Sequence, residues 1–242
     1  MLVRGLARSS AYWLEMRTLL EAERPVVVLD NRGVGRSDVP SAPIATEDMA
    51  DDVALVLRAC GVERADVLGI SLGGMIAQHV ALRHPHRVRR LVLACTSPGG
   101  RGARSLSLRA ALALARAATM PFADGIRSSA PWVLSEEALR ARPEIVDVWV
   151  AIAEREPRSR TGVFAQLLAA ARHDAWELLP HLSHPTLVVT GDADRLMPPE
   201  NSRALAERIP NASLRTLRGA GHDFPTERPE ETARIVSSFL GE

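Results

Sequence analysis

Gly69-Ile70-Ser71-Leu72-Gly73 lies between a short apolar run, Ala65–Ile70, and a segment with helical spacing, Leu72–Arg83. An apolar run followed by a helical pattern predicts a strand that turns directly into a helix. Glycines on both sides of the serine permit the tight turn and the close approach of strand and helix at such a junction. Ser71 would then lie at the amino end of a helix, where backbone N–H groups can stabilise an oxyanion. Ser71 is therefore a candidate nucleophile.

The rest of the chain repeats this alternation of short apolar runs and helical patterns. Strands are predicted at residues 1–3, 25–29, 65–70, 88–94, 185–190 and 213–217, and helices at 11–21, 46–59, 72–83, 202–208 and 229–240. Strands and helices in alternation predict an α/β fold with a doubly wound, mostly parallel sheet.

The alternation stops between residues 98 and 180. Helical stretches at 106–119 and 161–171 are separated there by Pro, Gly and Ser rather than by strands. We expect an inserted helical cap at 98–180 and a core made of residues 1–97 and 181–242. Because ligands bind at the carboxyl ends of the strands in open α/β sheets, the cap should roof the active site.

Two loops could supply the partners that a nucleophilic serine needs. Asp192 and Asp194 follow the predicted strand at 185–190, and His222 follows the one at 213–217. The carboxyl ends of parallel strands meet at one edge of the sheet, so these side chains should converge on Ser71. A serine hydroxyl needs a base, and the base needs an orienting carboxylate. His222 is the candidate base, with Asp194 and Asp192 competing for the carboxylate role.

Five motifs together resemble the α/β-hydrolase superfamily. They occur in the order typical of that family, at residues 2–6, 30–38, 69–75, 191–198 and 219–222. Within it the chain is similar to the small capped esterases and the 3-oxoadipate enol-lactone hydrolases. The resemblance implies that Ser71 is the nucleophile and that His222 is the general base and then the acid. It favours Asp194, the third residue after Gly191, as the carboxylate that fixes the histidine tautomer.

The resemblance also implies an oxyanion hole formed by the backbone N–H groups of Leu6 and Leu72. Family members usually have His-Gly where this chain has Arg4-Gly5. The donor is the backbone of the following residue, so we expect the hole to be retained. Family members generally begin with two antiparallel strands before the strand that here starts at Met1, and this sequence lacks them, so either the start is misplaced or the sheet is shortened. A shortened sheet would expose residues 25–29 as an apolar edge, which predicts a homo-oligomer or poor solubility.

The Ser-His-Asp set predicts a hydrolase that cleaves a small carboxylic ester or lactone through an acyl-enzyme. A 3-oxoadipate enol-lactonase is the more specific alternative. A non-catalytic or truncated ligand-binding member of the fold is an alternative of a different class. The short amino terminus and Arg4 favour that alternative, and the complete Ser-His-Asp set opposes it. No metal and no organic cofactor is expected.

Composition and charge limit the remaining possibilities. The chain has 242 residues, of which 46% are hydrophobic and 24% charged, as in ordinary globular proteins. Lys+Arg total 30 and Asp+Glu total 29, so no net field favours nucleic acid or an anionic membrane surface. No apolar run reaches the length of about 20 residues that spans a bilayer. We expect a cytoplasmic enzyme, with Cys60 and Cys95 as buried thiols in apolar surroundings.

Other notable side chains have mainly structural interpretations. Asp30 and Arg32 are predicted to pair and brace the loop after their strand; a phosphate site at Gly33 and Gly35 is disfavoured because no Lys-Ser/Thr follows. Four arginines of the cap are predicted to form a solvated face, with recognition of an anionic substrate as the alternative: Arg101, Arg104, Arg109 and Arg116. The tryptophans are candidates for pocket walls or core: Trp13, Trp132, Trp149 and Trp176. The other histidines are expected to be structural or solvated: His79, His84, His86, His173, His181 and His184.

Overall fold

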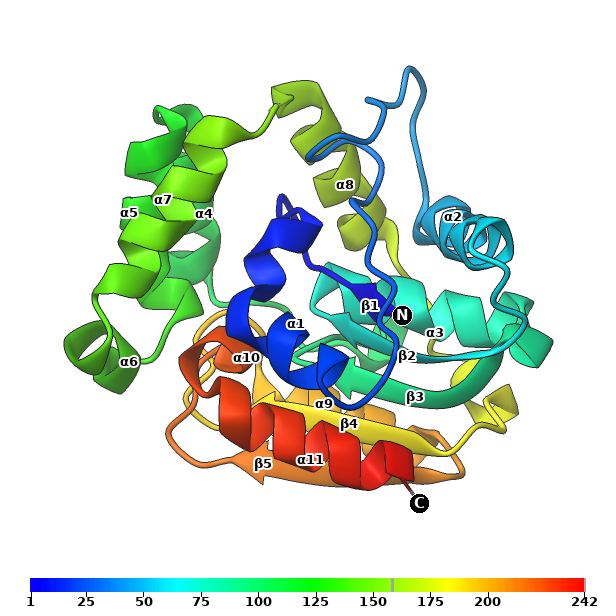
Figure 1. The fold of residues 1–242 in the computed structure, drawn as a ribbon. Coiled ribbons are helices and arrows are strands. Elements are labelled where there is room, and N and C mark those ends of the chain that lie inside the picture. Colours follow the sequence, from blue (N-terminus) through cyan, green and yellow to red (C-terminus); the bar gives the residue numbers. More distant parts are fainter. Residues whose placement is uncertain (158, 242) are drawn as a thin grey trace.

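The computed structural model describes residues 1–157 and 159–241, and a five-stranded parallel sheet forms its centre (Figure 1). The strands lie side by side in the order in which they occur along the chain: β1 (Leu2–Val3), β2 (Ala65–Ile70), β3 (Val88–Ala94), β4 (Thr186–Gly191) and β5 (Ala212–Leu217). Every pairing is parallel. Strand β4 is buried along its whole length and β3 is buried from Leu91 to Ala94, as expected for strands covered on both faces. The predicted α/β fold with a doubly wound parallel sheet is confirmed.

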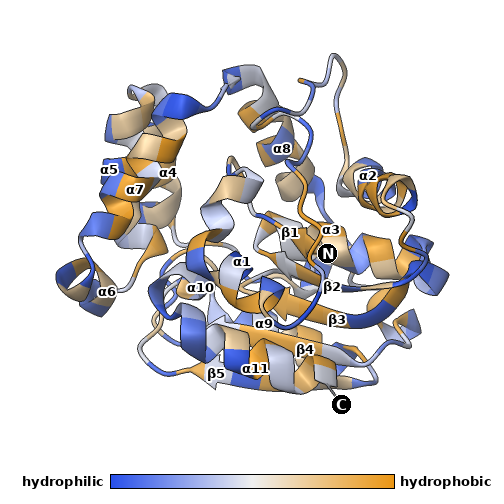
Figure 2. Ribbon diagram, in the orientation of Figure 1, coloured by the Kyte–Doolittle hydropathy of each residue, from blue (hydrophilic) through white to orange (hydrophobic). Residues whose placement is uncertain are grey.

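Helices cover both faces of the sheet. On one face lie α1 (Leu14–Glu21) and α11 (Pro229–Gly241), and on the other lie α2 (Thr46–Ala59), α3 (Leu72–Arg83) and α9 (Pro199–Arg208). Side chains that alternate along the strands enter two separate apolar clusters: Leu68 and Ile70 pack toward α1 and α11, and Val67 packs toward α2 and α3. The hydropathy colours of Figure 2 show these apolar strands enclosed by amphipathic helices.

The predicted strand at 25–29 is reduced to a single bridge. Val28 pairs in parallel with Leu2, and the Leu2 N–H donates to the Val27 carbonyl over 2.9 Å. The predicted strand was therefore wrong in extent, although the segment does lie beside β1. Strand β1 offers only two residues, and Pro25 has no N–H to donate, so a longer ladder cannot form. Val28 pairs with one side of β1 and β2 pairs with the other side. Strand β1 is therefore the point where the order of the strands reverses.

The segment between β3 and β4 is helical, as expected. It contains α4 (Leu108–Thr119), α5 (Phe122–Val133), α6 (Glu136–Ala141), α7 (Glu144–Arg155) and α8 (Arg160–Arg172). These helices form two parts (Figure 1). Helices α5 to α7 build an apolar cluster of their own, which includes Tyr12 and Trp149. Helix α8 instead packs on the core, where Gly162 touches Gly33 and the Gln166 amide donates to the Arg32 carbonyl over 2.8 Å.

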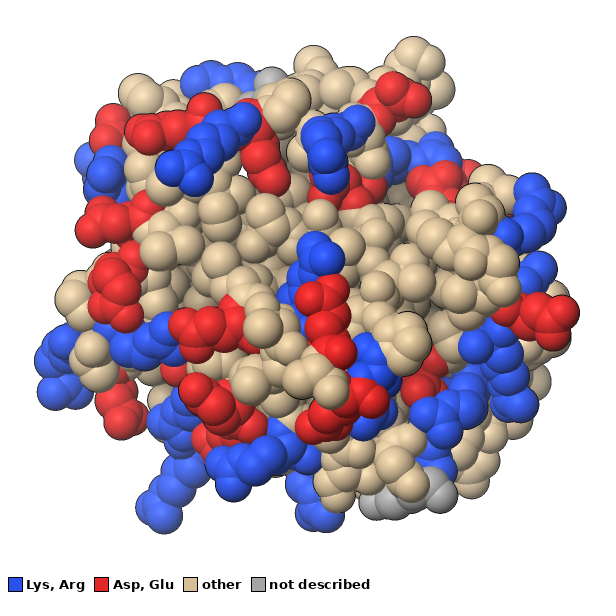
Figure 3. Space-filling view, in the orientation of Figure 1, with Lys and Arg blue, Asp and Glu red and all other residues tan. Residues whose placement is uncertain are grey.

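Short single-turn elements complete the described chain: η1 (Ser10–Trp13), η2 (Pro85–Arg87), η3 (Gly100–Gly102), η4 (Leu179–His181) and α10 (Phe224–Glu227). None of the helices in residues 1–157 and 159–241 is both long and apolar enough to cross a bilayer. Charged side chains of both signs are mixed over the face shown in Figure 3. This mixture agrees with the balanced charge of the sequence.

Two structural expectations are wrong. Cys60, at the carboxyl end of α2, is exposed rather than buried, because the apolar stripe of that helix faces the sheet from other positions. Arg32 does not pair with Asp30; it forms a bidentate pair with Asp52 at 2.6 Å. Asp30 braces its loop through the backbone, since it accepts the N–H groups of Ser10 at 2.7 Å and Arg36 at 3.0 Å.

Candidate active site

Ser71 occupies the sharp turn between β2 and α3. Its φ of 56° and ψ of −122° place it in a left-handed region that costs a non-glycine residue free energy. Two hydrogen bonds hold the turn: the Ser71 N–H donates to the Ala94 carbonyl over 2.9 Å, and the Thr96 hydroxyl donates to the Ser71 carbonyl over 2.7 Å. The tight turn predicted from the sequence is thus present at the carboxyl end of β2, and Ser71 is strained within it.

Glycines allow three chain segments to meet around this serine. A Cβ on Gly69 would overlap the Gly73 carbonyl, and one on Gly73 would overlap the Val3 carbonyl of β1. A Cβ on Gly5 would lie 3.2 Å from the Cβ and 3.7 Å from the Oγ of Ser71. The loop after β1 therefore packs directly against the serine side chain.

The two N–H groups expected to form an oxyanion hole are available. Within residues 1–157 and 159–241, no protein acceptor receives the backbone N–H of Leu6 or of Leu72. The loop that carries Leu6 is fixed on both sides: Asn31 donates to the Arg4 carbonyl over 2.9 Å, and the Ala7 N–H donates to Gln166 over 3.0 Å. Two unpaired donors near a serine hydroxyl suit a carbonyl oxygen that becomes negatively charged.

Asp194 and His222 meet in a buried hydrogen bond. His222 Nδ1 lies 2.8 Å from Asp194 Oδ2, and the two side chains are 7% and 0% exposed. The other oxygen of Asp194 accepts the N–H groups of Leu196 at 2.8 Å and Met197 at 2.7 Å. Asp192 instead is exposed and accepts the Gly219 N–H. Of the two competing aspartates, the structure brings only Asp194 to the histidine.

The environment of His222 raises its pKa above the ordinary value of 6.5. Burial by itself lowers the pKa of the imidazole, but the charge of Asp194 and its hydrogen bond raise the pKa by more. The charge of Asp223 also raises it. An imidazole whose Nδ1 is held by a carboxylate leaves Nε2 free for proton transfer.

Ser71 and His222 lie at the same edge of the sheet without a direct hydrogen bond in the described parts of the chain. Cys95 lies between them. It follows Ala94, which accepts the Ser71 N–H, and its Sγ lies within 4.8 Å of a carboxylate oxygen of Asp194 and a ring nitrogen of His222. Burial, followed by the charge of Asp194, raises the pKa of this thiol. Catalytic contacts are often long before substrate binds, so the missing bond is compatible with proton transfer between them.

A buried ion pair that sequence spacing does not predict joins the loop after β1 to the histidine loop. Arg4 donates to both oxygens of Asp223, at 3.0 Å and 2.6 Å, and its guanidinium lies 4.9 Å from the centre of the Trp13 ring. Asp223 directly follows His222 in the chain, but its carboxylate is held by Arg4. Its pairing with Arg4 shows why this chain tolerates arginine at the position where histidine was expected.

Glu227 is a second unforeseen side chain near the histidine. Its buried carboxylate accepts the Ser135 N–H at 2.7 Å, the Ser135 hydroxyl at 3.0 Å and the Gly221 N–H at 3.0 Å. Burial raises its pKa despite these hydrogen bonds. Glu227 thus ties the residue before His222 to the start of α6. Sequence spacing contains no signal for it, because all the partners depend on the tertiary fold.

The remaining candidates lie away from Ser71 or have structural contacts. Arg101 pairs with Glu177 at 2.7 Å, and Arg109 and Arg116 are exposed on α4, so the predicted solvated face is present. Buried His79 and His173 stack edge to face, with ring centres 5.2 Å apart. Burial lowers the pKa of His173 to about 3.

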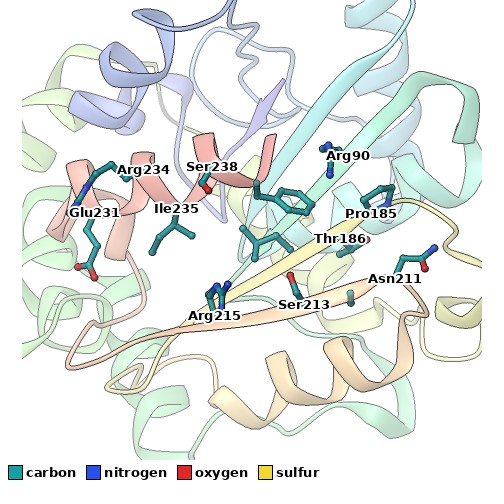
Figure 4. Close-up of a pocket in the computed structure, with 13 residues that line it drawn as sticks. Arg90, Pro185, Thr186, Asn211, Ser213, Arg215, Glu231, Arg234, Ile235 and Ser238 are labelled. Carbon is teal, nitrogen blue, oxygen red and sulfur yellow. The ribbon is translucent and has the colours of Figure 1, made fainter. Parts of the chain in front are cut away.

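Figure 4 shows a pocket of about 590 Å³ between α11 and the amino ends of β4 and β5. Pro185 and Thr186 line it at the start of β4, and Asn211 lines it just before β5. Substrates bind open α/β sheets at the carboxyl ends of the strands, so this pocket is at the wrong end for chemistry at Ser71.

The sequence profile of the alpha/beta hydrolase fold family matches residues 1–229. The chain belongs to this family. A putative carbamate hydrolase, RutD, from Caulobacter segnis is 30% identical over 249 residues, which cover 98% of this chain and 88% of that protein.

Solved structures that are similar to this alpha/beta hydrolase include esterases and lactonases. A thermophilic esterase from Thermogutta terrifontis, solved with malate bound, has a TM-score of 0.83 and 32% identity, covering 99% of this chain and 88% of that one. Est816, described as an N-acyl homoserine lactone degrading enzyme, has a TM-score of 0.83 and 30% identity, covering 98% and 91%. The enol-lactonase from Burkholderia xenovorans LB400 has a TM-score of 0.87, with 24% identity over 100% and 90% of the two chains. At that identity the enol-lactonase shows the shared fold.

Proposed function

We propose that this protein is a serine hydrolase that cleaves a small carboxylic ester or lactone through an acyl-enzyme. The observation that carries the proposal is the buried 2.8 Å hydrogen bond between His222 and Asp194, at the edge of the sheet where Ser71 sits in its strained turn. A histidine oriented by a carboxylate and a serine beside unpaired N–H groups form the set that acyl transfer requires.

The reaction follows from these positions. His222 Nε2 takes the hydroxyl proton of Ser71 as Oγ attacks the substrate carbonyl, and the N–H groups of Leu6 and Leu72 stabilise the resulting oxyanion. The imidazolium then gives that proton to the leaving alcohol oxygen, which leaves an ester on Ser71. Water attacks this ester with His222 again as base, and the acid is released. Asp194 keeps the imidazole in the productive tautomer throughout.

Residues 98–180 are proposed to act as a cap over a core of residues 1–97 and 181–242. Helices α5 to α7 approach the histidine loop through Ser135 and Glu227, and α8 approaches the loop after β1 through Gln166 and Ala7. The two parts of the insert therefore contact the loops that surround the proposed site. Substrate selection would depend on the side chains they present there.

The comparisons support the ester and lactone classes without choosing between them. The relatives at about 30% identity include a thermophilic esterase and a lactone-degrading enzyme. A carbamate is a further candidate, because RutD is named as a putative carbamate hydrolase. The enol-lactonase alternative has support at the level of fold. A non-catalytic ligand-binding role fits less well, because it gives no reason for a strained serine beside two unpaired N–H groups.

Acylation of Ser71 tests the proposal directly. The purified chain is mixed with p-nitrophenyl butyrate, release of nitrophenolate is followed for a burst and turnover, and intact mass detects the acyl adduct. We expect turnover and an adduct that both disappear in Ser71→Ala. A folded wild-type protein that forms no adduct with short esters or lactones would refute the catalytic proposal and favour ligand binding.

The predicted homo-oligomer remains a proposal with a separate test. The valines of residues 25–29 are half-buried and Val28 bridges to Leu2, so the segment exposes less apolar edge than expected. Light scattering at high protein concentration decides this point, since a clean monomer would contradict it.

A further inference from the structure

Arg8 lies in the loop that packs against the candidate nucleophile. Its N–H donates to the Gly5 carbonyl over 3.3 Å, and Gly5 is the residue beside Ser71. Ala7 turns the chain with a φ of 58° and is held by Gln166 of α8. Arg8 is therefore placed by a fixed turn, three residues beyond the glycine that touches the serine side chain.

Two aromatic rings hold the Arg8 guanidinium. Its central carbon lies 4.4 Å from the centre of the Tyr12 ring and 4.3 Å from that of the Trp149 ring. The Tyr12 hydroxyl donates to the Trp149 carbonyl over 3.1 Å, which fixes the rings relative to each other. A guanidinium packed between rings loses little further freedom when it binds an anion.

This guanidinium has no carboxylate partner in the described part of the chain. Both oxygens of neighbouring Asp223 are taken by Arg4, and no other acid among residues 1–157 and 159–241 forms an ion pair with Arg8. Burial lowers the pKa of Arg8. The indole N–H of Trp149, fully buried beside it, also has no acceptor among the residues that the structure describes. A partly buried cation and an unsatisfied donor in one place are costly unless an anion completes them.

We propose that Arg8 binds a carboxylate of the substrate, so that this hydrolase prefers esters or lactones that carry an acid group remote from the scissile bond. The proposal rests on the proposed function, since it places the acid group in the site that serves Ser71. Arginine suits this role because its planar fork matches both oxygens of a carboxylate. The exposed arginines of α4 are not expected to contribute.

A matched pair of esters tests the preference. Monomethyl adipate is compared with its neutral isostere, in which an isopropyl group replaces the carboxylate, and methanol release gives kcat/KM for each. The variants are Arg8→Gln and, as a control, Arg116→Gln on α4. We expect the wild type to prefer the acid ester, and Arg8→Gln to lower the acid-to-neutral ratio of kcat/KM by roughly 10- to 100-fold, as for loss of a hydrogen-bonded charge. Arg116→Gln should leave the ratio unchanged.

Several results would overturn the assignment of Arg8. They are a wild type without preference for the acid ester, an unchanged ratio in Arg8→Gln, or an equal loss in the Arg116→Gln control. Thermal melts confirm that each variant is folded, and Arg8→Lys provides a second variant that keeps the charge but loses the planar fork. Arg8→Lys should retain part of the preference.

Binding separates this proposal from the proposed function. Calorimetric titration of Ser71→Ala with adipate needs no catalysis, and Arg8→Gln in the same background should weaken binding by a similar factor. If neither ester is hydrolysed but adipate binds through Arg8, the hydrolase proposal fails and the anion site stands. If adipate does not bind Ser71→Ala, the anion site fails whatever the esters show.

Discussion

Breaking the pair between Arg4 and Asp223 should be among the most destabilising single changes in this chain. Arg4→Met removes the guanidinium and leaves the Asp223 carboxylate buried without its bidentate partner. Removing one member of a buried ion pair costs about 3–5 kcal/mol. In a domain of this size 1 kcal/mol shifts the melting temperature by about 2–4 °C, so we expect Tm to fall by about 6–20 °C.

Calorimetric melts of Arg4→Met, Asp223→Leu and the double variant measure this effect. The double variant should recover a large part of the loss, because it leaves no unpaired charge in the apolar surroundings. Arg17→Met is the matched control: Arg17 pairs with Glu21 over 2.7 Å, but the side chains are 46% and 39% exposed. That change should cost less than about 1 kcal/mol. A loss from Arg4→Met no larger than that of the control, or strict additivity in the double variant, would refute the reasoning.

Three further outcomes follow from the same structure. Gly73→Ala should cost at least about 2 kcal/mol in denaturant unfolding, because its Cβ would overlap a carbonyl of β1, whereas Gly241→Ala, with open space around it, should be close to neutral. Native protein should take up one equivalent of a thiol reagent at Cys60, and Cys95 should react only after unfolding, as mass spectrometry would show. The kcat/KM of hydrolysis should fall as the pH drops through a pKa above 6.5, because protonated His222 cannot accept the serine proton; an acid limb below that value would contradict this assignment.

Local sequence signals predicted the elements of the fold well. The strands at 65–70 and 88–94 and the helices at 46–59 and 72–83 have the predicted bounds, because each combines a clear periodicity with a clear stop. The prediction of a full strand at 25–29 was wrong because an apolar run is a local property, whereas hydrogen bonding to β1 depends on how many residues of β1 are available to pair. The prediction that Cys60 is buried was wrong for a related reason, since apolar neighbours in the sequence do not specify which side of a helix faces solvent.

In the candidate site, too, some features follow from local sequence signals and others depend on the tertiary structure. Ser71, Asp194 and His222 each follow a strand, and in a parallel sheet that fact alone sends them to one edge. The choice between Asp192 and Asp194 could not be made from strand positions, because both belong to one loop and only side-chain direction separates them. The resemblance favoured Asp194, and the fold directs that side chain to His222.

The sequence by itself determined the layered α/β fold and the edge of the sheet at which the chemistry-bearing loops meet, because periodicity and strand order are encoded locally. Only the tertiary structure decided which charges are paired. Arg4 and Asp223 are 219 positions apart and form a buried pair, while Arg8, four residues from Arg4, lies between two rings with no carboxylate partner in the described part of the chain. Both are arginines in one short loop, and their difference arises from burial and from partners that folding alone brings within reach.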